Sequence, residues 1–365
     1  MPQTLSKTKH FHITKVLRQR IKTLSPGDQL PTVSELKQEF DASQATVDRA
    51  IGILRREGLV NRPLGKQRLV VAEIMDPATH RIALIRPDYP SRVIEEICRS
   101  TVEAGRKRDW LFSQTYYRTL NGLDLERAVD GKDGAVLLLV PETLPVHIYR
   151  ALQKPRLPIV IAQETLADPP TSWVCSDAES EARLAVEHLA ELGHRRILCM
   201  VPGIMTGPME KSVEGWTKAM QKLGEENLDE LLINCNIPTG EDPLFRGYEF
   251  LSRWISHPHP DFTALYCATS EGGMAFLRVL REHGIDVPQK VSVTASAGLS
   301  HLGAFMNPPL TALEYEMKEY GDSVTAVLDN LLNHPKRRAA LQQILIRPHL
   351  VARASSGPIA LDHRK

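Results

Sequence analysis

The sequence has few of the features that mark disulfide-bonded, metal-binding or membrane proteins. It contains five cysteines and no Cys-x-x-Cys pair, and no apolar run approaches the length needed to span a bilayer. The cysteines are widely spaced, mostly in or beside apolar runs, so we expect buried thiols without disulfide or metal roles: Cys98, Cys175, Cys199, Cys235 and Cys267. The N-terminus is polar and basic, without a following hydrophobic segment. We therefore expect a cytoplasmic protein without a secretory signal or membrane contact.

Catalytic and nucleotide-binding motifs are also missing. The sequence has no Gly-x-x-x-x-Gly-Lys-Ser/Thr, Gly-x-Gly-x-x-Gly, Gly-x-Ser-x-Gly or His-Glu-x-x-His motif. The nearest phosphate-loop match runs from Gly203 to Ser212 and lacks the glycine before Lys211. Ser300 and His301 are adjacent in sequence, which does not make a nucleophile and its base. We expect neither an enzyme nor a cofactor.

Charge is divided unevenly along the chain. At 365 residues and 42% hydrophobic content, the chain is long enough for two or three domains with substantial cores. Residues 1–72 hold 13 Lys plus Arg against 6 Asp plus Glu, a local net charge of +7, whereas the remainder carries 32 against 38, or −6. A basic head on an acidic body is typical of a nucleic-acid-binding module joined to a module that does not bind DNA.

Two short helices are predicted in tandem between residues 25 and 60. Thr32, with Glu35 three residues later, forms a capping box for the first, and Ser43 caps the second. Gly58 closes the second helix. An earlier helix is predicted from the apolar spacing of Ile13, Val16, Leu17, Ile21 and Leu24. This order and punctuation indicate a helix-turn-helix.

The apolar stripe of the helix that follows Ser43 fixes which side chains face outward. Val47, Ala50, Ile51 and Leu54 recur at helical spacing, so the opposite face holds Ala45, Arg49, Gly52 and Arg56. Arg49 stands between small residues and is our candidate for base readout. A Gly65 turn between two short strand-like runs predicts a wing. The full set of candidate DNA-binding residues is Thr32, Ser43, Gln44, Ala45, Thr46, Arg49, Lys66 and Arg68. Ser43 is equally well explained as a helix cap alone.

The first seventy residues resemble the winged helix-turn-helix domain of GntR-type bacterial regulators. The resemblance rests on Ser25-Pro-Gly-Asp-Gln-Leu-Pro, the capped helix, Ser43-Gln-Ala-Thr-Val and Leu54-Arg-Arg-Glu-Gly-Leu. The family usually has arginine at the positions held here by Gln44 and Asp48. A carboxylate beside DNA is unfavourable unless it accepts from a cytosine amino group or pairs with a cation. The operator therefore cannot be transferred from other members.

Beyond His80, short apolar runs alternate with helical patterns. The runs predict parallel strands covered by helices on both faces, a doubly wound α/β fold. They begin at Arg81, Gly134, Leu157, Arg196, Glu230, Thr263 and Val291.

Residues 80–357 resemble the effector domain of the LacI/GalR family. The matching stretches are Asp177 with His188-Leu, Leu192-Gly-His-Arg-Arg-Ile, Pro308-Pro-Leu-Thr, Gly321 and Ile346-Arg-Pro-His-Leu-Val-Ala-Arg-Ala-Ser. The resemblance implies two sub-domains of periplasmic-binding-protein type I, a ligand cleft between them, and pairing of two bodies into a homodimer. We expect His188 and His194 to serve packing rather than ligand binding.

The expected domain organisation follows from both resemblances. A winged helix-turn-helix domain spans residues 1–72, a linker 73–80, the effector domain 81–357 and a tail 358–365. Within the effector domain we expect an N-sub-domain at about 81–162 and 296–318, and a C-sub-domain at about 163–295 and 319–353.

Candidate ligand-binding residues come from the loops at the carboxyl ends of the strands. They are Arg86, Asp88, Tyr116, Glu142, Glu164, Lys211, Ser212, Ser270, Glu271 and Ser296. Sugar-responsive LacI/GalR members have an arginine where this chain has Ser212, an Asn-Asp pair at Ser270-Glu271 and an acidic pair at Ala297-Gly298. An ordinary hexose or pentose is therefore disfavoured as the effector.

These patterns together predict a cytoplasmic transcriptional regulator, and we expect a repressor. The fusion of a GntR-like winged helix to a LacI-like effector domain is an arrangement also seen in arabinose-type repressors. The expected partners are a double-stranded DNA operator, a small-molecule effector and a second copy of the chain. The alternatives are a sugar-binding receptor, disfavoured by the basic head, and a regulator with a degenerate pocket and no sugar effector.

Overall fold

The computed structural model divides the chain into two compact units, residues 1–78 and 79–365. It describes residues 3–21, 23–25, 27–61, 68–71, 80–88, 91–140, 142–205, 207–238, 240–296, 300–334 and 340–359. The expected linker, residues 73–80, lies outside these ranges except for His80, which begins the first strand of the second unit. No helix among the described residues is long and apolar enough to cross a membrane.

The first unit, called the head, is a winged helix-turn-helix. Its helices are α1 (Gln3–Ile21), α2 (Val33–Glu39) and α3 (Gln44–Arg56), and its strands β1 (Val60–Asn61) and β2 (Val70–Val71) pair antiparallel. The predicted stripe is confirmed, because Val47, Ala50, Ile51 and Leu54 are buried against Ile13 and Leu17 of α1. Ion pairs from Arg18 to Glu57 and from Arg20 to Glu39 join α1 to the other helices.

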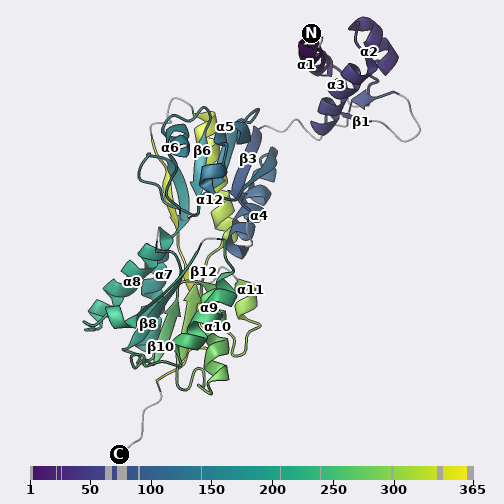
Figure 1. Cartoon of the computed structure of the whole chain (residues 1–365). Coiled ribbons are helices and arrows are strands. Elements are labelled where there is room, and N and C mark those ends of the chain that lie inside the picture. The colour runs from purple at the N-terminus through teal and green to yellow at the C-terminus, as the bar shows by residue number, and fades with distance from the viewer. Residues whose placement is uncertain are drawn as a thin grey trace, which may run out of the picture. The chain divides into compact units, whose positions relative to one another are not determined.

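The second unit, called the body, contains two lobes (Figure 1). The N-lobe sheet has the order β13-β7-β6-β5-β3-β4, and all its strands are parallel. Helices α4 and α12 pack on one face, and α5 and α6 on the other. The elements are β3 (His80–Pro87), α4 (Arg92–Arg106), β4 (Trp110–Tyr117), η1 (Leu120–Gly122), α5 (Leu125–Ala128), β5 (Gly134–Leu138), α6 (Val146–Gln153), β6 (Ile159–Ala162), β7 (Ser172–Ser176), α12 (Met317–Asn333) and β13 (Gln343–Ile346).

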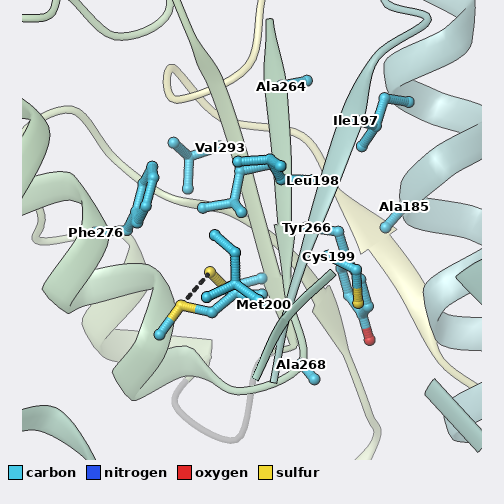
Figure 2. Packing of buried hydrophobic residues seen from close by; sticks show 14 of the residues in the cluster. Ala185, Ile197, Leu198, Cys199, Met200, Ala264, Tyr266, Ala268, Phe276 and Val293 are labelled. Atoms are coloured by element: carbon cyan, nitrogen blue, oxygen red, sulfur yellow. Dashed lines mark hydrogen bonds between the residues drawn. The ribbon is translucent and has the colours of Figure 1, made fainter. Parts of the chain in front are cut away.

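The C-lobe repeats this plan with the strand order β14-β12-β11-β10-β8-β9, in which only β14 is antiparallel. Figure 2 shows Cys199 and Tyr266 on one face of this sheet, and Met200 and Phe276 on the other. The elements are α7 (Ala178–Glu191), β8 (Ile197–Gly203), α8 (Pro208–Lys222), η2 (Asp229–Leu231), β9 (Leu232–Ile237), α9 (Pro243–Trp254), β10 (Ala264–Cys267), α10 (Ser270–Glu282), β11 (Ser292–Ser296), α11 (Ser300–Gly303), β12 (Thr311–Glu314) and β14 (His349–Val351).

The expected division of the body into sub-domains is wrong in three places. We expected 163–176 in the C-lobe, but β7 pairs with β6 and belongs to the N-lobe sheet. We expected 296–318 in the N-lobe, but β12 pairs with β11 in the C-lobe. We expected 319–353 in the C-lobe, but α12 packs on α4 and β13 pairs with β7. The chain therefore crosses between lobes after β7, after β12 and after β13, because long-range pairing decides which sheet each segment joins.

The expected burial of the cysteines and the expected packing roles of the two histidines agree with the structure. The cysteines are free, and all are buried except the half-buried Cys235. His188 Nε2 lies 2.8 Å from Ser356 Oγ, and buried His194 contacts the hydroxyls of Thr263 and Ser292 at 2.9 and 3.0 Å. Burial lowers the pKa of both histidines, which is consistent with structural roles.

Candidate functional site

The outward face of α3 is open and carries unpaired charge. Gln44, Ala45, Asp48 and Arg49 are all exposed. Arg49 and Asp48 make no hydrogen bond or ion pair with any other described residue. Both side chains are therefore free to meet an external partner, and the small Ala45 lets the helix backbone approach one closely.

The polar residues at the start of α2 and α3 act as caps. Thr32 Oγ1 accepts the Glu35 N–H, and the Glu35 carboxylate accepts the Thr32 N–H, so the predicted capping box is confirmed. Ser43 is confirmed as the N-cap of α3, and its Oγ lies 2.8 Å from Thr46 Oγ1. Thr46 is only 8% exposed, and its contact with DNA stays a prediction. It is buried because its hydroxyl completes the cap.

The wing is described only in part. Arg68 Nη2 lies 3.4 Å from a Glu35 carboxylate oxygen, and both side chains are about half exposed. This ion pair joins the wing to α2 and leaves Arg68 accessible to phosphate. Lys66 and the Gly65 turn, as well as the side chain of Arg56, lie outside the described residues.

The body contains a cavity of about 270 Å³ between its lobes. Ser91, Val93, Gln163 and Met317 line it from the N-lobe side. Residues of the α8 and α10 N-termini and of the loop after β9 line it from the C-lobe side. A molecule in this cavity would contact both lobes.

Four of the ten predicted ligand-binding residues line the cavity. They are Ser212 on α8, Ser270 and Glu271 at the start of α10, and Ser296 at the end of β11. Ser270 Oγ donates to Glu271 Oε2 at 3.0 Å. Ser296 Oγ donates to the carboxylate of Glu181 at 3.0 Å. The predicted residues that line the cavity therefore all belong to the C-lobe.

The other six predicted residues lie outside the lining. Arg86 is buried in a bidentate pair with Glu95 at 2.9 and 2.5 Å, and its guanidinium lies 5.5 Å from the ring of the exposed Tyr116. Lys211 donates to Glu214 at 2.6 Å.

The remaining three carboxylates have neighbours of their own. Asp88 lies 3.9 Å from Arg118, Glu142 accepts the Leu120 N–H at 3.1 Å, and Glu164 is buried against Gly207. A residue that follows a strand end lies at the correct edge of the sheet. Its place in the sequence does not show whether its side chain already has a partner.

Glu181 lines the cavity from α7 and was not among the predicted residues. Its carboxylate accepts from Tyr266 Oη at 2.8 Å, Tyr315 Oη at 2.5 Å and Ser296 Oγ. Burial raises its pKa to about 7, although the three hydroxyls favour the ionised form. The sequence does hold a sign of this role, because Glu181 falls on the apolar stripe of Ala178, Ala182 and Ala185, where a charged residue is unexpected.

Comparison with known proteins matches both units. Residues 11–68 match the model of the bacterial regulatory proteins of the gntR family, and residues 186–356 match the periplasmic binding protein-like domain. The arabinose metabolism transcriptional repressor of Geobacillus stearothermophilus is 23% identical over 92% of this chain and 93% of its own. The transcriptional regulator MalR of Streptomyces coelicolor is 27% identical over 59% of this chain, which spans 60% of MalR.

Solved structures share the fold. A complex of the transcriptional regulator CelR with cellobiose has a TM-score of 0.67 at 21% identity, covering 86% of this chain and 91% of CelR. A LacI family regulator from Enterococcus faecium with bound ribose has a TM-score of 0.64 at 18% identity, covering 76% of this chain and 99% of its own.

The head, the body and its cavity together define a DNA-binding transcriptional regulator with an effector pocket. The chain joins a DNA-binding domain of the gntR family to a periplasmic-binding-protein-like effector domain of the LacI/GalR type.

Proposed function

We propose that this protein is a homodimeric repressor that binds its operator through α3 and responds to a small molecule in the interlobe cavity. The observation that carries the proposal is the open face of α3, where Arg49 has no partner among the residues that the structure describes. Relatives that share both units or the body are named as repressors, including the arabinose repressor and the ribose operon repressor of Escherichia coli K12.

The proposed DNA contact divides between two kinds of residue. Arg49, in the first half of α3, is suited to a bidentate contact with a guanine edge in the major groove. Ser43, Gln44, Thr32 and Arg68 are suited to phosphates, which position the head without reading sequence. In this division, sequence-specific binding depends on one long side chain, that of Arg49, which is flanked by Ala45 and Gly52.

The proposed control acts through the relative arrangement of the lobes. A molecule that contacts both lobes binds one arrangement better than another, and binding therefore shifts the population towards that arrangement. In a homodimer, this shift would change the spacing of two α3 helices on a two-fold operator. We place the protein in the bacterial cytoplasm, where its DNA target is found, and assign it no catalytic role.

The test is selection of bound DNA from a random library by the full-length protein, followed by gel-shift titration. We expect one palindromic site, and we expect Arg49→Ala to weaken it by about 1–3 kcal/mol while relaxing preference at one base step. Arg99→Ala on α4 removes the same charge from the body and is the matched control, with unchanged affinity expected. Recovery of random DNA by the wild-type protein would refute the proposal.

A further inference from the structure

The charged side chains in the described lining of the interlobe cavity are all carboxylates. Its described lining contains three carboxylates, Glu181, Glu241 and Glu271, and no lysine, arginine or histidine. The undescribed residues that adjoin this lining in sequence are also without basic side chains: Tyr89, Pro90, Thr206, Thr239, Ala297, Gly298 and Leu299. An anionic ligand, such as a sugar phosphate, would therefore meet no basic side chain in this lining, only the N-termini of α8 and α10.

Two of the three carboxylates have no cationic partner in the part of the chain that the structure describes. Glu241 is neutralised by Arg246, whose Nε lies 2.6 Å from its carboxylate. Glu271 accepts a hydrogen bond from Ser270, and Glu181 accepts from the three hydroxyls described above. Arg86 and Lys211, which were predicted to contact the ligand, are paired with Glu95 and Glu214 instead.

An unsatisfied acceptor on the N-lobe side adds a second, independent observation. Gln163 lines the cavity, and its side-chain Oε1 is buried without a hydrogen-bond partner among the described residues. Its backbone has φ 75°, a conformation that is uncommon outside glycine. A buried acceptor without a donor is unfavourable, so a ligand N–H at this point would satisfy it.

The rest of the lining is mostly apolar. Val93, Ile204, Met209, Ile237 and Met317 contribute from both lobes. Such a surface favours a compact apolar body over a ligand that carries hydroxyls on every carbon.

We propose that the cavity binds a small organic amine, whose ammonium group lies between Glu181 and Glu271 and whose apolar body packs on the Val93–Met317 side. This inference rests on the proposed function, because the amine is the effector of that regulator. It also accounts for the absence of an arginine at Ser212, where a cation would repel the ligand.

The titration of Glu181 gives the proposal a distinctive pH dependence. The groups that face its carboxylate are Tyr266 of β10, Ser296 of β11 and Tyr315 after β12, with Asp177 at the start of its own helix. With a pKa of about 7, Glu181 is mostly protonated at pH 6 and mostly ionised at pH 8, whereas an alkylammonium remains charged throughout. Affinity for an amine should therefore rise about tenfold from pH 6 to pH 8.

The experiment compares matched compounds that differ only in charge, using thermal shift and then calorimetry on the full-length protein. One set is cyclohexylamine, cyclohexanol and cyclohexanecarboxylate, and a second is benzylamine, benzyl alcohol and benzoate. We expect the amines to bind at least tenfold more tightly than their counterparts. Glu181→Gln should remove this preference for amines and flatten the pH profile. If this variant folds poorly, Glu271→Gln is used in its place and should weaken amine binding. Glu187→Gln, on the exposed side of α7, is the matched control and should bind as the wild type does.

Each outcome decides the inference separately from the proposed function. Tighter binding of the neutral or anionic compounds, or failure of both amines to bind, would overturn the amine assignment. Operator selection by the same protein is measured without any ligand, so its success or failure tests the regulator itself.

Discussion

Glu164 gives the sharpest test of how burial controls stability in the body. It follows β6 in the N-lobe, is 9% exposed, and accepts no hydrogen bond from any described residue. Its carboxylate lies against Gly207, the N-cap of α8, so closely that a Cβ added there would be 2.1 Å from Oε2. Burial, reinforced by the charge of Glu210, raises its pKa to about 8.

The sign and size of the effect follow from this pKa. A carboxyl group with a pKa raised from about 4.5 stabilises the folded state fully below pH 4.5, and that contribution is lost as pH rises through 8. At about 1.4 kcal/mol per pH unit, the upper limit of the loss is about 5 kcal/mol. Glu164→Gln cannot ionise and should abolish this part of the pH dependence.

The assay is urea unfolding of the full-length protein at pH 5, 7 and 9, monitored by tryptophan fluorescence. We expect the variant and the wild type to be similar at pH 5, and the variant to be more stable at pH 9 by up to about 5 kcal/mol. Glu210→Gln, which removes only the smaller cause, should lower the wild-type pH dependence slightly. Parallel pH profiles for wild type and Glu164→Gln would refute the reasoning.

Three further predictions concern the head and the lobe packing. Asp48→Asn should raise affinity for random DNA, because it removes an unpaired carboxylate from α3. In a selection experiment it should lower any preference for cytosine by about 1–3 kcal/mol. An unchanged preference would exclude base readout by Asp48. Gly321→Ala should destabilise the body by about 1–3 kcal/mol in urea unfolding. The reason is that the added Cβ would lie 2.4 Å from the Ser100 backbone across the α12–α4 contact. A gain in stability would show that α12 can move. Thr32→Ala should lower stability by about 1 kcal/mol through loss of the capping box with Glu35, and equal melting curves would contradict this value.

The head was predictable because its determinants are local. Thr32 and Ser43 lie within a few residues of the backbone groups that they cap, and the α3 stripe depends only on helical spacing. Strands such as β5 and β6 were predictable because continuous apolar runs mark burial on both faces. The lobe to which α12 belongs was not, because α12 packs against α4, which lies about two hundred residues earlier in the chain.

The candidate cavity was predictable at the level of sheet edges, and less so at the level of residues. Ser270 and Ser296 were predicted correctly to line the cavity because they follow strand ends. Arg86 and Lys211 pair with Glu95 and Glu214 instead, and no spacing rule identifies these partners. Glu181 acts from the middle of a helix, where strand-end reasoning does not look.

The three crossings between the lobes determine how this protein can be taken apart and reassembled. Neither lobe is a continuous piece of chain, so a truncation that removes one lobe also removes strands from the other, and the body must be inherited or engineered whole. The head, by contrast, is joined to the body by one short segment of sequence, and a single splice can exchange it. We therefore expect the body to keep its cavity when another DNA-binding head replaces this one, so that the same cavity could act at a different promoter.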